Sequence, residues 1–217
     1  MYSFIKSWMV TTCVAVSGFG SGVVNASALE VLVIDSAGSP LPDAVVELVA
    51  PSVSMNAEKK PLIVDQVDKS FLPKVLVAPV NSRVNFPNSD EIRHHVYSFS
   101  EAKTFQLKLY AGEPKEPILF DKTGLVVLGC NIHDSMVGYI YVSESPAYLT
   151  GQDGMVQIDR LPANIEVLTV WHPDAEQGVH FRKNVKVPTL LNNKITVQMS
   201  INPPEPRNTF EDVFGYD

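Results

Sequence analysis

The stretch that organises the chain is Leu128-Gly129-Cys130-Asn131-Ile132-His133-Asp134-Ser135-Met136-Val137-Gly138. It holds a thiol, an imidazole and a thioether at Cys130, His133 and Met136, with two residues between each pair. These side chains suit copper, because a thiolate and an imidazole bind it strongly and a thioether can approach more weakly from an axial direction. A plane of one Cys and two His ligands needs a second imidazole, which must come from elsewhere in the chain.

The second imidazole is expected from the upstream stretch Asn88-Ser89-Asp90-Glu91-Ile92-Arg93-His94-His95-Val96-Tyr97-Ser98. If His94 and His95 lie on a regular strand, they face opposite sides and cannot both bind one ion. Local alternation favours His95, because it shares a face with Tyr97 and Phe99, which have the character of core residues. The residues alone therefore leave the choice between the two histidines open.

Together these motifs resemble the cupredoxin family, and the short loop between Cys130 and Met136 is similar to that of amicyanin. The match runs from about Pro61 to Val142. The resemblance implies a β-sandwich that binds one type 1 (blue) copper ion per chain and transfers single electrons. It selects His94, Cys130, His133 and Met136 as the metal ligands, with His133 the more exposed imidazole. It departs from the family at His95, because Asn usually follows the first ligand His.

The first 28 residues have the pattern of a cleaved secretion signal. Lys6 is followed by a largely apolar segment, and Ala26-Ser27-Ala28 has the small residues of a cleavage site. A membrane anchor is the rival interpretation, but the segment is interrupted by Ser, Thr and Gly and no long apolar run follows. We therefore expect a periplasmic protein without stable membrane insertion.

Cys130 is the only cysteine outside that signal, since the chain has 2 and Cys13 is the other. A lone thiol in an exported protein cannot form an internal disulfide, which favours a ligand role over an inert buried one. The formal net charge of −7 disfavours nucleic acid as a partner. We expect a redox protein as the partner instead.

The fold class is predicted to be all-β, because no long helical periodicity occurs and short alternating runs follow one another. Residues 29–57 resemble the first hairpin of the carboxypeptidase regulatory-like, transthyretin-like sandwiches, and residues 146–202 resemble the later half of the same family. The resemblance implies an immunoglobulin/transthyretin-like β-sandwich split by a Greek-key cupredoxin domain at 58–145. Two unrelated flanking pieces are the alternative. The tail 203–217 is rich in proline and acidic residues and is expected to be disordered.

Two functions remain open at this stage. The first is single-electron transfer, and the second is periplasmic copper binding or trafficking, or a structural binding role without redox turnover. Zinc is a possible substitute in the same site, because Cys and His suit it too. Catalysis is not expected, since four protein ligands leave no open position on the metal. His172 and His180 are assigned to structural or surface roles.

Overall fold

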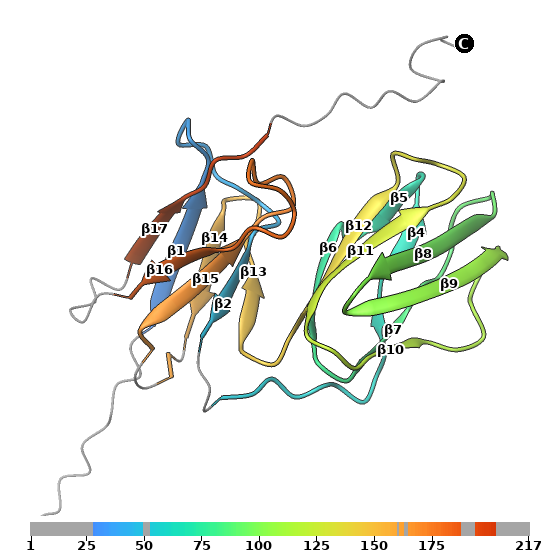
Figure 1. Cartoon of the computed structure of the whole chain (residues 1–217), viewed down its shortest axis with the longest axis horizontal. Coiled ribbons are helices and arrows are strands. Elements are labelled where there is room, and N and C mark those ends of the chain that lie inside the picture. Colours follow the sequence, from blue (N-terminus) through green and yellow to red (C-terminus); the bar gives the residue numbers. More distant parts are fainter. Residues whose placement is uncertain (1–27, 50–52, 160, 163–164, 188–193, 203–217) are drawn as a thin grey trace, which may run out of the picture.

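The computed structural model describes residues 28–49, 53–159, 161–162, 165–187 and 194–202, and within these residues every regular element is a β-strand. The all-β prediction is confirmed. The strands form two sandwiches that lie side by side (Figure 1). Almost all of the predicted signal and all of the predicted disordered tail lie outside the described residues. No helix that could cross a membrane occurs in the described part of the chain.

The first sandwich, here called the split sandwich, takes its strands from both ends of the described chain. Its apolar core comes from alternating residues such as Leu29, Val31 and Val33, all fully buried. One sheet has the order β14-β1-β17 and the other β13-β2-β15-β16. The strands are β1 (Leu29–Ile34), β2 (Val45–Leu48), β13 (Ala147–Leu149), β14 (Met155–Ile158), β15 (Val167–Trp171), β16 (Lys183–Lys186) and β17 (Lys194–Gln198).

The second sandwich, here called the inserted sandwich, lies between β2 and β13 in the sequence. A five-stranded sheet of order β6-β12-β11-β8-β9 faces a three-stranded sheet of order β10-β7-β3, and the hairpin β4-β5 completes it. The strands are β3 (Leu62–Ile63), β4 (Asp65–Val67), β5 (Ser70–Leu72), β6 (Val75–Pro79), β7 (Ser82–Asn85), β8 (His94–Ser100), β9 (Lys103–Tyr110), β10 (Ile118–Phe120), β11 (Gly124–Cys130) and β12 (Val137–Ser143).

The two chain segments that join the sandwiches lie next to each other. β2 and β13 pair antiparallel, with Ala147 opposite Glu47, and the Leu48 amide donates to the Pro146 carbonyl at 2.8 Å. The chain therefore leaves and re-enters the split sandwich at one place, an arrangement in which a domain insertion is tolerated. Whether each sandwich folds alone stays a prediction.

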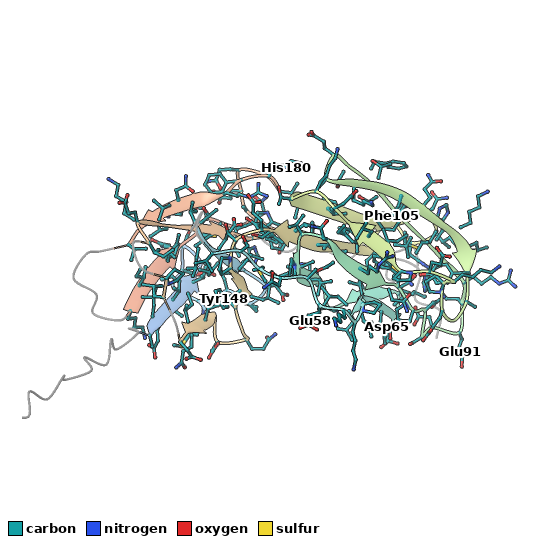
Figure 2. All side chains as sticks on the ribbon, turned by 90° about the horizontal axis from the view of Figure 1, so that it is seen from below. Glu58, Asp65, Glu91, Phe105, Tyr148 and His180 are labelled. Carbon is teal, nitrogen blue, oxygen red and sulfur yellow. The ribbon has the colours of Figure 1, made fainter. Side chains whose placement is uncertain are left out.

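The sandwiches meet through a cluster of buried apolar residues. Trp171 of β15 is fully buried, with its ring centroid 5.6 Å from Tyr139 and 5.7 Å from Tyr141 of β12. Tyr141 donates to Glu47 of β2 at 2.8 Å and lies under the Arg182 guanidinium at 5.1 Å. Figure 2 shows Phe105 in the inserted sandwich, Tyr148 in the split one and His180 above the junction. The contact thus combines three aromatic rings, Tyr139, Tyr141 and Trp171, with aliphatic side chains from both sandwiches.

Candidate metal centre

Three side chains that could bind a metal converge at one end of the inserted sandwich. Cys130 is the last residue of β11 and His94 the first of β8, and the ladder between these strands pairs Cys130 with Val96. His133 lies on the short connection from β11 to β12. Its carbonyl accepts the Met136 amide at 3.0 Å, which tightens this loop. Two paired strands and one short loop therefore fix the three groups.

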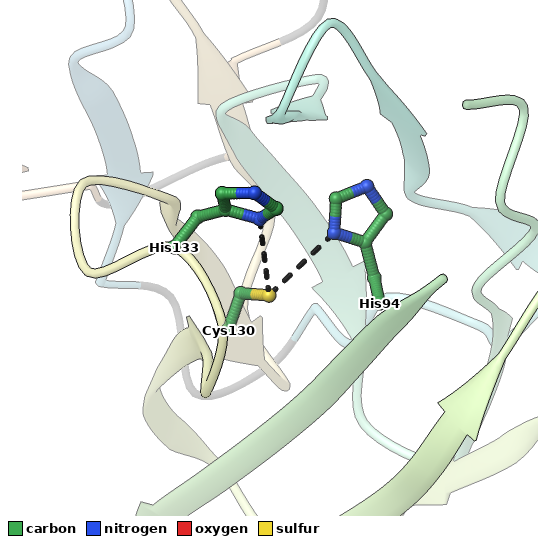
Figure 3. Close-up of side chains that lie close together, drawn as sticks. All are labelled: His94, Cys130 and His133. Carbon is green, nitrogen blue, oxygen red and sulfur yellow. Dashed lines mark hydrogen bonds between the residues drawn. The ribbon is translucent and has the colours of Figure 1, made fainter. Parts of the chain in front are cut away.

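Both imidazoles present Nδ1 to the thiol. Cys130 Sγ lies 3.6 Å from His94 Nδ1 and 4.0 Å from His133 Nδ1, as Figure 3 shows. All three ligand atoms lie within 4.8 Å of one another. A thiolate sulfur about 2.3 Å and an imidazole nitrogen about 2.0 Å from one ion are about 3.5–3.8 Å apart at tetrahedral to trigonal angles. The 3.6 Å separation lies in this range and the 4.0 Å separation slightly above it, and a thiolate with two imidazoles is a ligand set that suits copper.

Burial differs among the predicted ligands. His94 and Cys130 are buried, whereas His133 is partly exposed, which is the relation expected from the resemblance. Met136 is 1% exposed and belongs to the same core cluster as Cys130. The structure therefore brings His94, Cys130 and His133 into one group and places Met136 in the apolar core beside it. Ligation by these four residues stays a prediction.

The face of β8 that turns toward the core differs from the one expected from alternation. His94, Val96 and Ser98 are buried, whereas Phe99 is 68% exposed. His95 points away from the thiol, and its ring centroid lies 6.2 Å from Tyr97. The argument from alternation in favour of His95 was therefore wrong in its premise, because Tyr97 and Phe99 are not core residues.

A residue next to the site that the sequence did not indicate is Asp90. Its Oδ2 lies 2.6 Å from His94 Nε2, the ring nitrogen opposite the one that faces Cys130. Asp90 stands four residues before His94 in a non-helical segment, a spacing that alone gives no sign of contact. The contact arises because the chain turns between β7 and β8.

His172 and His180 lie in the split sandwich, outside the candidate metal site. His172 is 5% exposed, with Nε2 3.2 Å from the Pro42 carbonyl and Nδ1 accepting the Asp174 amide at 3.1 Å. His180 is exposed. His172 is thus held by hydrogen bonds within the fold.

Comparison with known proteins gives likenesses to solved structures only. No protein-family model matches the chain, and no curated protein sequence matches it. Part of the chain is similar to a copper-containing nitrite reductase from Thermus scotoductus SA-01, with 29% identity, a TM-score of 0.38, and coverage of 52% of this chain and 28% of that one. The present chain thus corresponds to less than a third of that reductase chain.

Two smaller copper proteins are also similar to part of the chain. One is an amicyanin variant in its reduced Cu(I) form at pH 4, with 17% identity, a TM-score of 0.36, and coverage of 46% of this chain and 99% of that one. The other is a purple cupredoxin from Nitrosopumilus maritimus, with 21% identity, a TM-score of 0.34, and coverage of 41% and 100%. Neither accounts for the whole chain.

Proposed function

We propose that this chain is an exported type 1 copper protein that transfers single electrons. The observation that carries the proposal is the buried Cys130 thiol with imidazole nitrogens at 3.6 and 4.0 Å. His94, Cys130 and His133 would hold one copper ion per chain, with Met136 as a weak axial ligand. Copper bound there would supply a one-electron couple between Cu(I) and Cu(II).

The chain's own contribution is a rigid set of ligands. His94 and Cys130 stand on adjacent strands of one sheet, and His133 and Met136 on a loop closed by the bond between the Met136 amide and the His133 carbonyl. Ligands fixed in this way change position little when the metal charge changes. Small reorganisation is what an electron carrier needs, whereas a delivery protein needs a way to release its ion.

The partly exposed edge of His133 is the proposed point of electron entry and exit. Two apolar residues close to it in the sequence are exposed, Ile132 at 50% and Val137 at 37%. We propose that a redox protein docks there. Export to the periplasm rests on the signal-like residues 1–28, and no catalytic turnover is proposed, since four ligands leave no open position on the metal.

The first experiment loads the purified protein with Cu(II) and records its visible absorption spectrum and copper content. We expect one copper per chain and an intense band from thiolate-to-copper charge transfer. Cys130→Ala should abolish the band, because the thiolate is its source. A colourless oxidised protein with one bound copper per chain would refute the proposal.

A second experiment separates electron transfer from copper delivery. Reversible one-electron exchange with small redox partners should be fast, and no copper should move to an acceptor protein in the same time. Exchange should slow when Ile132 is replaced by Glu, because a charge then replaces the exposed apolar side chain next to His133. Rapid transfer of Cu(I) to a chelator together with slow electron exchange would favour copper trafficking instead.

A further inference from the structure

The carboxylate of Asp90 and the thiol of Cys130 lie on opposite sides of one imidazole ring. Asp90 Oδ2 is 2.6 Å from His94 Nε2, and Cys130 Sγ is 3.6 Å from His94 Nδ1. The ring is fully buried, and the Asp90 side chain is only 12% exposed. Water therefore competes little with the contact between them.

Backbone donors of the β4-β5 hairpin fix the carboxylate in place. Its Oδ1 accepts the Asp68 amide at 2.7 Å, and Oδ2 accepts the Lys69 amide at 3.0 Å. Asp68 and Lys69 have φ values of 50° and 56°, as the two central residues of a tight hairpin turn often do. The turn thus presents two amides to Asp90 from a part of the chain about twenty residues upstream.

The loop that carries Asp90 is also held from within. The Asp90 amide donates to Asn88 Oδ1 at 3.1 Å. The Asn88 side-chain amide donates in turn to the carbonyls of Ile92 at 2.9 Å and Tyr110 at 3.0 Å. Asp90 therefore has little freedom to turn away from His94.

The charge on Asp90 decides which nitrogen of His94 carries hydrogen. The carboxylate of Asp90 accepts hydrogen bonds from the Asp68 and Lys69 amides and lies 2.6 Å from the imidazole, and hydrogen bonds of this kind favour the ionised form of a carboxyl. An ionised carboxylate can only accept hydrogen bonds, so Nε2 of His94 must donate. In the neutral ring, Nδ1 then has a free lone pair directed toward Cys130.

We propose that Asp90 is a positioning residue that fixes His94 with hydrogen on Nε2 and, by its negative charge, stabilises the more highly charged oxidised metal and lowers the reduction potential. A carboxylate behind a ligating imidazole makes that imidazole more basic and fixes its orientation. The low exposure of both groups strengthens this electrostatic effect. The inference rests on the proposed copper site.

The test replaces Asp90 by Asn, which keeps the size of the side chain and removes the charge. Cu(II) affinity should fall by about 10- to 100-fold, the range typical for loss of such a partner. Cu(I) affinity should change much less, so the potential should rise by about 59 mV for each tenfold difference. Glu91→Gln is the matched control, because it removes the same charge from the adjacent exposed residue, and it should move the potential far less.

A measurement on the metal-free wild-type protein tests the same inference without copper. Nitrogen-15 NMR, at a pH where the ring is neutral, should show His94 with hydrogen on Nε2. Hydrogen on Nδ1 would overturn the inference even if the Asp90→Asn variant does not fold. Equal potentials for Asp90→Asn and Glu91→Gln would also overturn it and leave the copper proposal intact. A wild-type protein that binds no copper would refute the copper proposal instead.

Discussion

Two buried histidines illustrate how the surroundings of one side chain set its role. His94 lies between a carboxylate and a thiol, while His172 lies between a backbone carbonyl and a backbone amide. Nε2 of His172 donates to the Pro42 carbonyl and Nδ1 accepts from Asp174, so the neutral ring is fully satisfied. This arrangement ties His172 to the fold and leaves it no free nitrogen for a metal.

The stability of the protein should depend on pH through His172. Its burial lowers the pKa from 6.5, which outweighs the neighbouring groups that favour the charged ring. The unfolded chain then takes up a proton at a higher pH than the folded chain. The stabilising contribution of the neutral ring is therefore complete above about pH 6.5 and is lost as pH falls from there through the lowered folded pKa.

Urea unfolding of the metal-free protein at pH 7.5 and pH 5.5 checks this expectation. The free energy of unfolding should fall more between these pH values in the wild type than in His172→Gln, which cannot titrate. His180→Gln is the control, because His180 is exposed and its loss should leave the wild-type pH dependence intact. The same fall in wild type and His172→Gln would contradict the assignment.

Met136→Leu should keep the blue colour and raise the reduction potential. An apolar axial position gives Cu(II) less stabilisation than a thioether does, and axial ligands tune the potential of such sites. The change conserves volume in the core and should cost less than about 1.5 kcal/mol of folding free energy. Spectroscopy and voltammetry of the variant check both expectations, and loss of copper binding would show that Met136 is more than a weak ligand.

The strands show where the sequence was informative and where it was not. The alternation of apolar and polar residues over 105–109 indicates a strand, and β9 is there. Regular alternation would turn Leu109 to the same side as Phe105 and Leu107, but Leu109 is 49% exposed. The cause is a bulge beside the candidate metal site, where the register between β8 and β9 shifts, with His94 opposite Tyr110 and Val96 opposite Leu107. One extra residue turns every later side chain to the other face.

The wrong assignment of Tyr97 and Phe99 to the core has a related cause. The outer face of the five-stranded sheet is also apolar, because Tyr139 and Tyr141 pack on Trp171 of the split sandwich. Sequence patterns cannot tell an apolar face that forms a core from one that meets another sandwich or solvent. The contact between Asp90 and His94 was equally hidden, because the backbone amides that hold Asp90 in place belong to Asp68 and Lys69, about twenty residues away in the sequence.

Gly138 of β12 lies in close contact with Phe71 of the β4-β5 hairpin. A Cβ atom added at Gly138 would lie 2.9 Å from Phe71 Cβ and 3.0 Å from its Cγ, and Phe71 is 3% exposed. Gly138→Ala should therefore cost about 1–3 kcal/mol of stability, as overpacking does. Gly151→Ala, at an exposed position in the split sandwich, is the control. Urea unfolding that gives both variants equal stability would contradict the close packing of β5 on β12.

Trp171 lies at the junction of the two sandwiches, so its fluorescence can be used to follow their contact. Trp171 is fully buried, and the only other tryptophan, Trp8, belongs to the predicted signal. The fluorescence of Trp171 in the mature protein should therefore be that of an indole ring shielded from water. Any treatment that separates the sandwiches should shift this emission to longer wavelength.

Deletion of the inserted sandwich tests the division of the chain into domains. Replacing 58–145 by a short Gly/Ser linker should leave a folded β-protein, because β2 and β13 already pair where the chain is cut. Trp171 and Val45 would then be exposed. The emission of Trp171 should therefore shift to longer wavelength, and the protein should self-associate. The division fails if this protein is unfolded while 58–145 alone folds and binds copper.

The insertion between β2 and β13 also favours an order in which the two sandwiches fold. β1 needs β17 as its parallel neighbour, with Glu30 opposite Lys194, so its sheet cannot close until these two distant segments of the chain meet. The inserted sandwich pairs strands within 62–143 and meets no such delay. Local pairings form faster than distant ones, because less chain entropy is lost on closing the loop. We therefore expect the inserted sandwich to fold first and to hold the ends of β2 and β13 together while the split sandwich assembles.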